Sequence, residues 1–322
     1  MWQGLIDYAS GEFHEPRFYG QKYNSMLESF FAVPLYWVGI PVYIALPIVT
    51  SFFSLFPFLL IGSLAYRKKT KLLGVLILIL PFLLPVEFAL ISSLSRGFVT
   101  GIFIASFGSF AIFYGNRNWS LVLAGFTSVI GISLNANAVL FSAVLFFYLL
   151  LRWGKQPRFY QYCGLGALLA LVLHYWAGWF YVSRPFYVLH DFSLIYSFDL
   201  IIQSFYDLDQ FFNFVAPIFW KQGFLVLIAF LIVASSLFYR GKYTLGTVFL
   251  ATPIIIILSL GVSKVHDGTS SIYFSHSRMY LALPSIVALS FTFFKQLKLT
   301  WIYLLIPLGF WLYKLQVLDK SI

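Results

Sequence analysis

Carboxylate side chains can accept and donate protons during catalysis, and in this chain they occur in two groups. The first group lies in residues 1–40 and the second in residues 183–222; the members are Asp7, Glu12, Glu15, Glu28, Asp191, Asp199, Asp207 and Asp209. Asp267 lies in a third segment. This grouping predicts a carboxylate-rich pocket. Long segments would also collect acids by length alone, and both interpretations stay open.

Basic side chains follow the opposite pattern and concentrate in short loops. These residues are Arg67, Lys68, Lys69, Lys71, Arg117, Arg152, Lys155, Arg158, Arg240, Lys242, Lys295 and Lys298. Short loops rich in Lys and Arg face the cytoplasm in membrane proteins, so the acidic segments are expected on the extracytoplasmic side. The net charge of +10 therefore reflects membrane topology, and we expect no nucleic-acid partner.

The elements that must position these charges are apolar. Hydrophobic residues make up 61% of the chain and charged residues only 10%, against roughly 25% charged residues in soluble domains. We predict an all-α polytopic membrane protein of about ten transmembrane helices, several near the lower end of the roughly 17 to 25 residues that a span needs. The expected spans are 41–65, 72–91, 98–114, 119–134, 137–151, 162–182, 223–239, 244–262, 279–294 and 300–314.

The simplest organisation is one bilayer-embedded domain. Residues 1–40 are predicted to form an extracytoplasmic first loop with an interfacial helix at 29–39. Residues 41–322 form the transmembrane domain, which includes an outer loop at 183–222. Within that loop, residues 198–219 place apolar side chains at near-helical spacing, which predicts an amphipathic helix lying on the membrane.

The order of these features resembles a known superfamily. The stretch "YGQKY" (Tyr19, Gly20, Gln21 and Tyr23) is followed by Glu28 and an apolar helix, and a later "SHSRMYLALP" places Arg278 at a helix start. Together with the segment "SRPFYVLHDFSLIYSFDL", this pattern is similar to the GT-C superfamily of polytopic glycosyltransferases. The similarity is to the bacterial branch related to protein mannosyltransferases and lipid A aminoarabinose transferases, and it extends over most of the chain as an architecture.

The resemblance implies transfer of a sugar from a polyprenyl-phosphate carrier to an acceptor glycan, lipid or protein. The reaction would occur on the extracytoplasmic side of a bacterial inner membrane, with a first-loop carboxylate as general base. The candidate catalytic residues are Asp7, Glu15 and Glu28. The candidate substrate-binding residues are Tyr19, Gln21, Tyr23, Arg96, Arg184, Lys264, His276 and Arg278, of which the Arg and Lys side chains would hold the carrier phosphate.

The sequence departs from the family pattern at its beginning. In the family, a transmembrane helix and an acidic pair precede the stretch matched by residues 7–23, whereas here that stretch begins a few residues after Met1. Residues 1–28 have the composition of neither a signal peptide nor a span. We expect that an upstream helix and the catalytic acid are absent from this version. Otherwise Asp7, Glu15 or Glu28 has taken the role, or the chain is not a catalyst.

Three other functions stay open. A noncatalytic relative could bind the lipid-linked sugar, and a polysaccharide polymerase or ligase would share the many spans and the large outer loop. A lipid-linked sugar transporter is expected to carry charged or polar residues at the membrane midplane and often to have related halves, whereas here the middle of the spans is nearly free of charge and no halves are visible. His266, Asp267 and His276 match no metal-ligand spacing, so we expect no cofactor, with a divalent metal ion as the alternative. His174 is expected to be a hydrogen-bonded core residue rather than a ligand.

Overall fold

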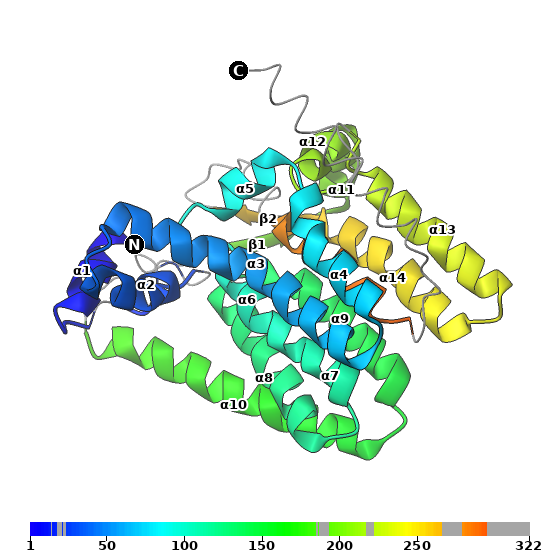
Figure 1. Ribbon diagram of the computed structural model, residues 1–322, viewed down its shortest axis with the longest axis horizontal. Helices are drawn as coiled ribbons and strands as arrows, with labels where there is room; N and C mark the ends of the chain where they lie inside the picture. The colour runs from blue at the N-terminus through cyan, green and yellow to red at the C-terminus, as the bar shows by residue number, and fades with distance from the viewer. Residues whose placement is uncertain are drawn as a thin grey trace.

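The computed structural model describes residues 1–13, 15–17, 21, 24–184, 186, 193–216, 222–265 and 279–294. Across these residues the protein is α-helical apart from one two-stranded ribbon (Figure 1), which confirms the predicted helical class. The elements are α1 (Trp2–Ala9), α2 (Leu27–Trp37), α3 (Val42–Lys68), α4 (Lys71–Ile79), η2 (Leu80–Leu83), α5 (Val86–Ser92), α6 (Thr100–Ser106), η3 (Phe107–Ser109), α7 (Phe110–Tyr114), α8 (Asn118–Leu134), α9 (Ala138–Trp153), α10 (Pro157–Val182), β1 (Ser193–Tyr196), α11 (Phe198–Tyr206), α12 (Leu208–Asn213), α13 (Leu225–Tyr239), α14 (Tyr243–Ser259), β2 (Val262–Val265), η4 (Tyr280–Ala282) and α16 (Leu283–Phe291).

Each predicted span before residue 295 falls on a helix or on a run of consecutive helices, and the run 300–314 lies outside the described residues. Among the described helices, 2 (α3 and α10) are long and apolar enough to cross a membrane, and the number is 3 if the bent pair α4–η2 and α5 is one span. The remaining apolar helices are shorter. The ten-span arrangement therefore stays a prediction.

The predicted span 72–91 is not one straight helix. The segment Lys71–Leu83 meets α5 at an angle of 86°. Leu84 adopts an extended conformation, with φ −73° and ψ 152°, because the ring of Pro85 disfavours the helical region for the residue before it. Pro85 also lacks an N–H group that could continue the helical hydrogen bonds. The chain therefore turns before Glu87, which lies in the first turn of α5.

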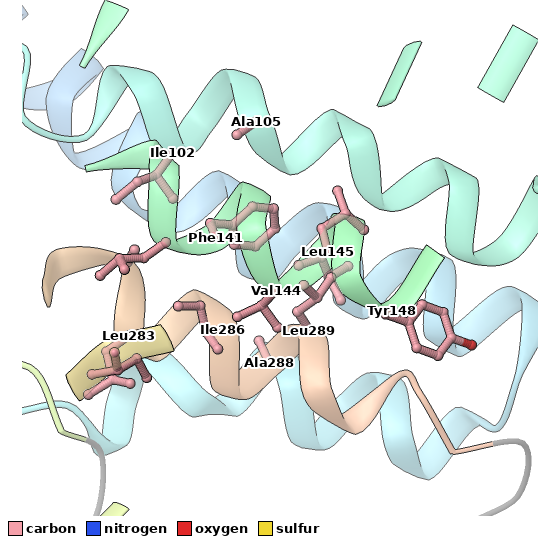
Figure 2. Close-up of a cluster of buried hydrophobic side chains, with 14 of the residues drawn as sticks. Ile102, Ala105, Phe141, Val144, Leu145, Tyr148, Leu283, Ile286, Ala288 and Leu289 are labelled. Carbon is pink, nitrogen blue, oxygen red and sulfur yellow. The ribbon is translucent and has the colours of Figure 1, made fainter. Parts of the chain in front are cut away.

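The main core forms where α9 packs between α6 and α16 (Figure 2). Phe141 and Leu145 of α9 are fully buried, and so is Ile286 of α16. Tyr148 stacks on Phe293 with ring centroids 4.1 Å apart. In a lipid environment apolar side chains gain little by leaving the solvent, so close van der Waals packing of this kind holds neighbouring helices together.

Glycine permits the close contact between α8 and α10. A Cβ atom on Gly166 would lie 2.0 Å from the carbonyl oxygen of Val122, and one on Gly125 would lie 2.1 Å from that of Cys163. Small residues let helix backbones approach in this way in membrane proteins. The close crossing holds α10 against α8 and so places its C-terminal turn, which carries Tyr181.

A second core fastens α1 and α2 to α3. Leu5, Met26 and Leu46 are among its buried members. The indole nitrogen of Trp37, at the end of α2, donates to the carbonyl oxygen of Ala9 at 3.0 Å. The helix predicted at 29–39 is therefore present as α2, and it packs against the start of α3 (Figure 1).

Basic side chains gather at the opposite end of the helices. The Lys68 ammonium lies 4.9 Å from the ring centroid of Tyr114, at the end of α7. Arg158, near the start of α10, donates from Nη1 to the carbonyl oxygen of Asn116 at 2.9 Å. We call this the basic end of the molecule, defined by Lys68, Arg152 and Arg158. Helices α1 and α2 and the described residues between them lie at the other ends of α3 and α10.

The segments before α11 and after α14 pair through the ribbon. β1 and β2 are antiparallel, with Leu194 opposite Lys264. In place of the single amphipathic helix predicted over 198–219, residues 198–213 form two short helices, α11 and α12, which meet at Asp207, and residues 217–219 lie outside the described part. Phe198, Ile202 and Tyr206 of α11 are exposed, whereas Phe211 and Phe212 of α12 are buried in the core. The second half of the predicted helix therefore serves packing, and only α11 presents apolar side chains outward.

Candidate functional site

Arg17 anchors the described residues between α1 and α2 (10–13, 15–17, 21 and 24–26), called the first loop from here on, to α8 and α10. Its side chain is 7% exposed, and its Nη1 donates to the carbonyl oxygen of Ser133 in the last turn of α8. Its Nη2 lies 3.1 Å from Nδ1 of His174 on α10. Carbonyl groups in the last turn of a helix have no partner within the helix and carry the negative end of its dipole. A guanidinium at this position both donates a hydrogen bond to such a carbonyl and is attracted by the dipole. Burial lowers the pKa of Arg17 from its usual value, partly offset by Tyr181.

The contact with Arg17 also defines the protonation state of the His174 ring. A guanidinium can only donate hydrogen bonds, so Nδ1 of His174 must accept. The ring is then neutral, with its proton on Nε2. The hydrogen bond predicted for His174 is present, but the side chain is half-buried and contacts the first loop, so it is not a core residue.

Glu15 and Tyr181 hold the same part of the first loop. Glu15 is 6% exposed, and the Tyr181 hydroxyl donates to its Oε2 at 3.1 Å. The same hydroxyl accepts from the backbone N–H of Arg17 at 3.0 Å. Tyr8 donates to the backbone carbonyl of Glu15 at 3.2 Å, which links α1 to the loop. The carboxylate of Glu15 is therefore committed to fastening the loop onto α10.

A chain of amide side chains continues the attachment toward α9. Asn135 donates from Nδ2 to Oδ1 of Asn24 at 2.6 Å, and Asn24 donates to Oε1 of Gln21 at 2.9 Å. Oδ1 of Asn135 accepts from the backbone of Asn137 at 3.0 Å, and Asn137 donates to the carbonyl of Phe98 at 3.0 Å. Gln21, a predicted substrate-binding residue, thus lies at the outer end of this network.

Gly97 lets the first loop rest directly on the start of α6. Its φ angle is +76°, a left-handed conformation that glycine adopts without steric cost. A Cβ atom at this position would lie 3.2 Å from the carbonyl oxygen of Ser25. This contact joins the polar network around Asn24 to a second buried group, around Glu28.

Glu28 ties α2 to two helices. Its side chain is fully buried. Thr50 of α3 donates to Oε2 at 3.0 Å, and Thr100 of α6 donates to Oε1 at 3.0 Å. Thr50 Oγ1 also lies 2.9 Å from the hydroxyl of Ser95. Both carboxyl oxygens therefore have a hydroxyl partner, and a polar group buried on these terms stabilises one arrangement of the three helices.

Burial raises the pKa of Glu28 to about 7, while hydrogen bonds from Thr100, Thr50 and the backbone of Gly97 act in the opposite direction. A carboxyl group with this pKa could exchange a proton near neutral pH. A general base must also reach the proton that it removes, and the Glu28 side chain has no exposed surface. In this arrangement the Glu28 carboxyl links three helices inside the protein and does not serve as a base in contact with substrate.

Asp7 is the one predicted catalytic acid that is not buried. It lies on α1, is partly exposed, and accepts from Nε2 of Gln3 at 2.6 Å. Asp7, Glu15 and Glu28 thus all lie at the end of the molecule opposite the basic end, but only Asp7 is open to an approaching molecule.

The described cations predicted to bind substrate occupy three different segments of the chain. Arg96 is exposed beside Gly97, and Arg184 is exposed just after α10. Lys264 lies in β2, opposite Leu194. The predictions for Tyr19, Tyr23, His276 and Arg278 fall outside the described residues.

Sequence reasoning missed most of the residues that make this site. Arg17, Asn24, Thr50 and Thr100 were assigned no role, Tyr181 was predicted only as part of an interfacial aromatic belt, and each is a common residue in a loop or helix. Within the described part of the chain, no group of three or more His, Cys, Asp or Glu side chains could hold a metal ion. His266, Asp267 and His276 lie outside that part.

Comparison with known proteins identifies no relative of this chain. No protein-family model, curated protein or solved structure matches the chain. The resemblance to GT-C glycosyltransferases, which depends on short motifs and the order of elements, therefore stays a prediction.

Proposed function

We propose that the chain is a membrane glycosyltransferase that moves a sugar from a polyprenyl-phosphate carrier to an acceptor on the extracytoplasmic side. The observation that supports this most is the position of the first loop. Arg17, Glu15 and Glu28, which flank the GT-C-like motif in the sequence, contact α8, α10 and α6 at the end of the molecule opposite the basic end. An outer site for a lipid-borne sugar would need this arrangement.

In this reaction Asp7 is the general base, because it alone of the three candidate acids is accessible. Its carboxylate takes the proton of an acceptor hydroxyl while the hydroxyl oxygen bonds to the anomeric carbon. The bond from that carbon to the carrier phosphate breaks, and the polyprenyl phosphate leaves with the electron pair. Glu15 and Glu28 hold the first loop in place, and an exposed cation such as Arg96 faces the phosphate.

A noncatalytic protein that binds lipid-linked sugar is the second candidate. It is favoured by the burial of Glu15 (6% exposed) and Glu28 (0% exposed), whose carboxylates both serve the packing of the loop. Such a protein would need the first loop but no base.

The two functions are separated by mass spectrometry of lipid-linked and envelope glycans in a deletion strain. We expect one glycan product to disappear and its polyprenyl-phosphate-sugar precursor to accumulate. The Asp7→Asn variant should restore less than about one part in 100 of the product, since general base catalysis contributes about 100-fold or more. The matched control is Glu12→Gln, an exposed acid just after α1, which should restore the product fully. Full restoration by Asp7→Asn would contradict the catalytic role and favour the binding protein.

A further inference from the structure

A groove of about 320 Å³ opens between the first loop and the C-terminal turns of α10. Phe13 and Pro16 form its wall on the loop side, and Trp176, Trp179 and Arg184 form the wall on the α10 side. Aromatic rings make up most of this surface. It lies at the end of a helix that is long enough to span a membrane, which is the level where Trp and Tyr collect in membrane proteins.

Arg184 supplies a positive charge at the mouth of the groove. Its guanidinium lies 4.4 Å from the ring centroid of Phe180, and no ion pair joins it to an acidic side chain among the residues that the structure describes. The stacked ring orients the guanidinium while leaving its N–H donors free of carboxylate partners. Phosphate is the anion whose geometry the guanidinium fork matches best, apart from carboxylate.

An apolar stripe on α10 runs into the groove. Leu165, Leu169, Val172, Trp176 and Trp179 recur at helical spacing, and each of these side chains is between 46% and 69% exposed. The stripe continues along the helix away from Arg184. A ligand with a negative head and an apolar tail would match this order of surfaces.

We propose that the groove binds the headgroup of an anionic phospholipid, with Arg184 holding the phosphate and Trp176 and Trp179 lying against the upper part of the acyl chains. The complementary charge selects an anionic lipid over a zwitterionic one, and the apolar stripe selects a lipid over free phosphate. Asp7 is not among the residues that line the groove, and lipid binding there does not depend on the proposed glycosyl transfer.

Tryptophan fluorescence tests this assignment. The full chain is reconstituted in phosphatidylcholine bilayers that contain a small fraction of dibrominated phosphatidylglycerol or, in matched samples, dibrominated phosphatidylcholine. One arginine near an anionic lipid surface gives about fivefold local enrichment, so the phosphatidylglycerol should quench more strongly at equal fraction. The excess quenching should be lost in Arg184→Gln and in the double variant Trp176→Phe with Trp179→Phe.

Trp119→Phe is the control, because Trp119 is exposed but lies at the start of α8, near the basic end. This variant should retain the excess quenching. Equal quenching by the two brominated lipids would assign the groove to another occupant and overturn the proposal. Excess quenching that persists in Arg184→Gln, or in the double tryptophan variant, would place the lipid elsewhere and overturn it as well.

Discussion

Replacing Arg17 by alanine is expected to lower the free energy of unfolding by about 3 kcal/mol, because two partly buried acceptors each lose a hydrogen bond from a charged donor, worth about 1.5 kcal/mol or more apiece. The guanidinium is 7% exposed and bridges the carbonyl of Ser133 and Nδ1 of His174. Its loss leaves the last turn of α8 without this donor and opens a cavity under the first loop. Thermal unfolding in detergent should show the loss, and chymotrypsin should cleave within residues 10–26 faster than in the wild type.

Two variants define what the Arg17 experiment measures. Arg117→Ala removes an exposed arginine at the other end of α8 and should leave both measurements unchanged. Arg17→Lys keeps the charge but lacks the planar fork, so it should recover only part of the stability. If Arg17→Ala unfolds and is cleaved as the wild type does, the anchoring of the loop described above is wrong.

The free energy of unfolding of the wild type, relative to that of the Glu28→Gln variant, is expected to fall as pH rises. The pKa of Glu28 is about 7 in the fold against 4.5 for a free carboxyl, so the folded state binds this proton more tightly than the unfolded state. The contribution of Glu28 to the free energy of unfolding is fully present below pH 4.5 and is lost as pH rises through about 7. The shift of 4.5 to about 7 corresponds to about 3 kcal/mol between the two ends of this range.

The measurement is the difference in melting temperature between wild type and Glu28→Gln, from roughly pH 4 to roughly pH 8.5. The glutamine amide can still exchange hydrogen bonds with Thr50 and Thr100 but carries no titrating proton. The same comparison with Glu12→Gln, at an exposed position, should show no trend with pH. A difference that does not change with pH for Glu28→Gln would show that this carboxyl is not buried as described.

The helices could be predicted from the sequence because each is an apolar run bounded by charged or polar loops, and such runs depend only on neighbouring residues. The bend at Leu84 and Pro85 also had a local signal, since a proline disfavours helix at the residue before it. The span predicted over 72–91 was nevertheless drawn as one helix through Pro85. The division of the segment 198–219 had no such signal, because Phe211 and Phe212 are buried by contacts with distant parts of the chain, including Tyr280.

The site could not be predicted because its contacts join residues far apart in the sequence. Glu28 depends on Thr100, 72 positions away, and Arg17 depends on His174, 157 positions away. Threonine and histidine within apolar helices carry no sign of which loop residue will meet them. The sequence pattern therefore indicated that acids collect at one end of the molecule. It did not indicate that Glu15 and Glu28 would be buried there and would hold the first loop and α2 against other helices.

The account depends most on orientation, because the acidic segments must lie outside the cytoplasm to meet a lipid-linked sugar there. Asp207 and Lys155 are both exposed, and they lie on segments that the charge distribution assigns to opposite sides. Each is replaced in turn by cysteine in a Cys163→Ala background, and intact cells are treated with a membrane-impermeant maleimide. We predict labelling at position 207 in intact cells and labelling at position 155 only after the membrane is permeabilised. Labelling of intact cells at position 155 but not at position 207 would contradict the account.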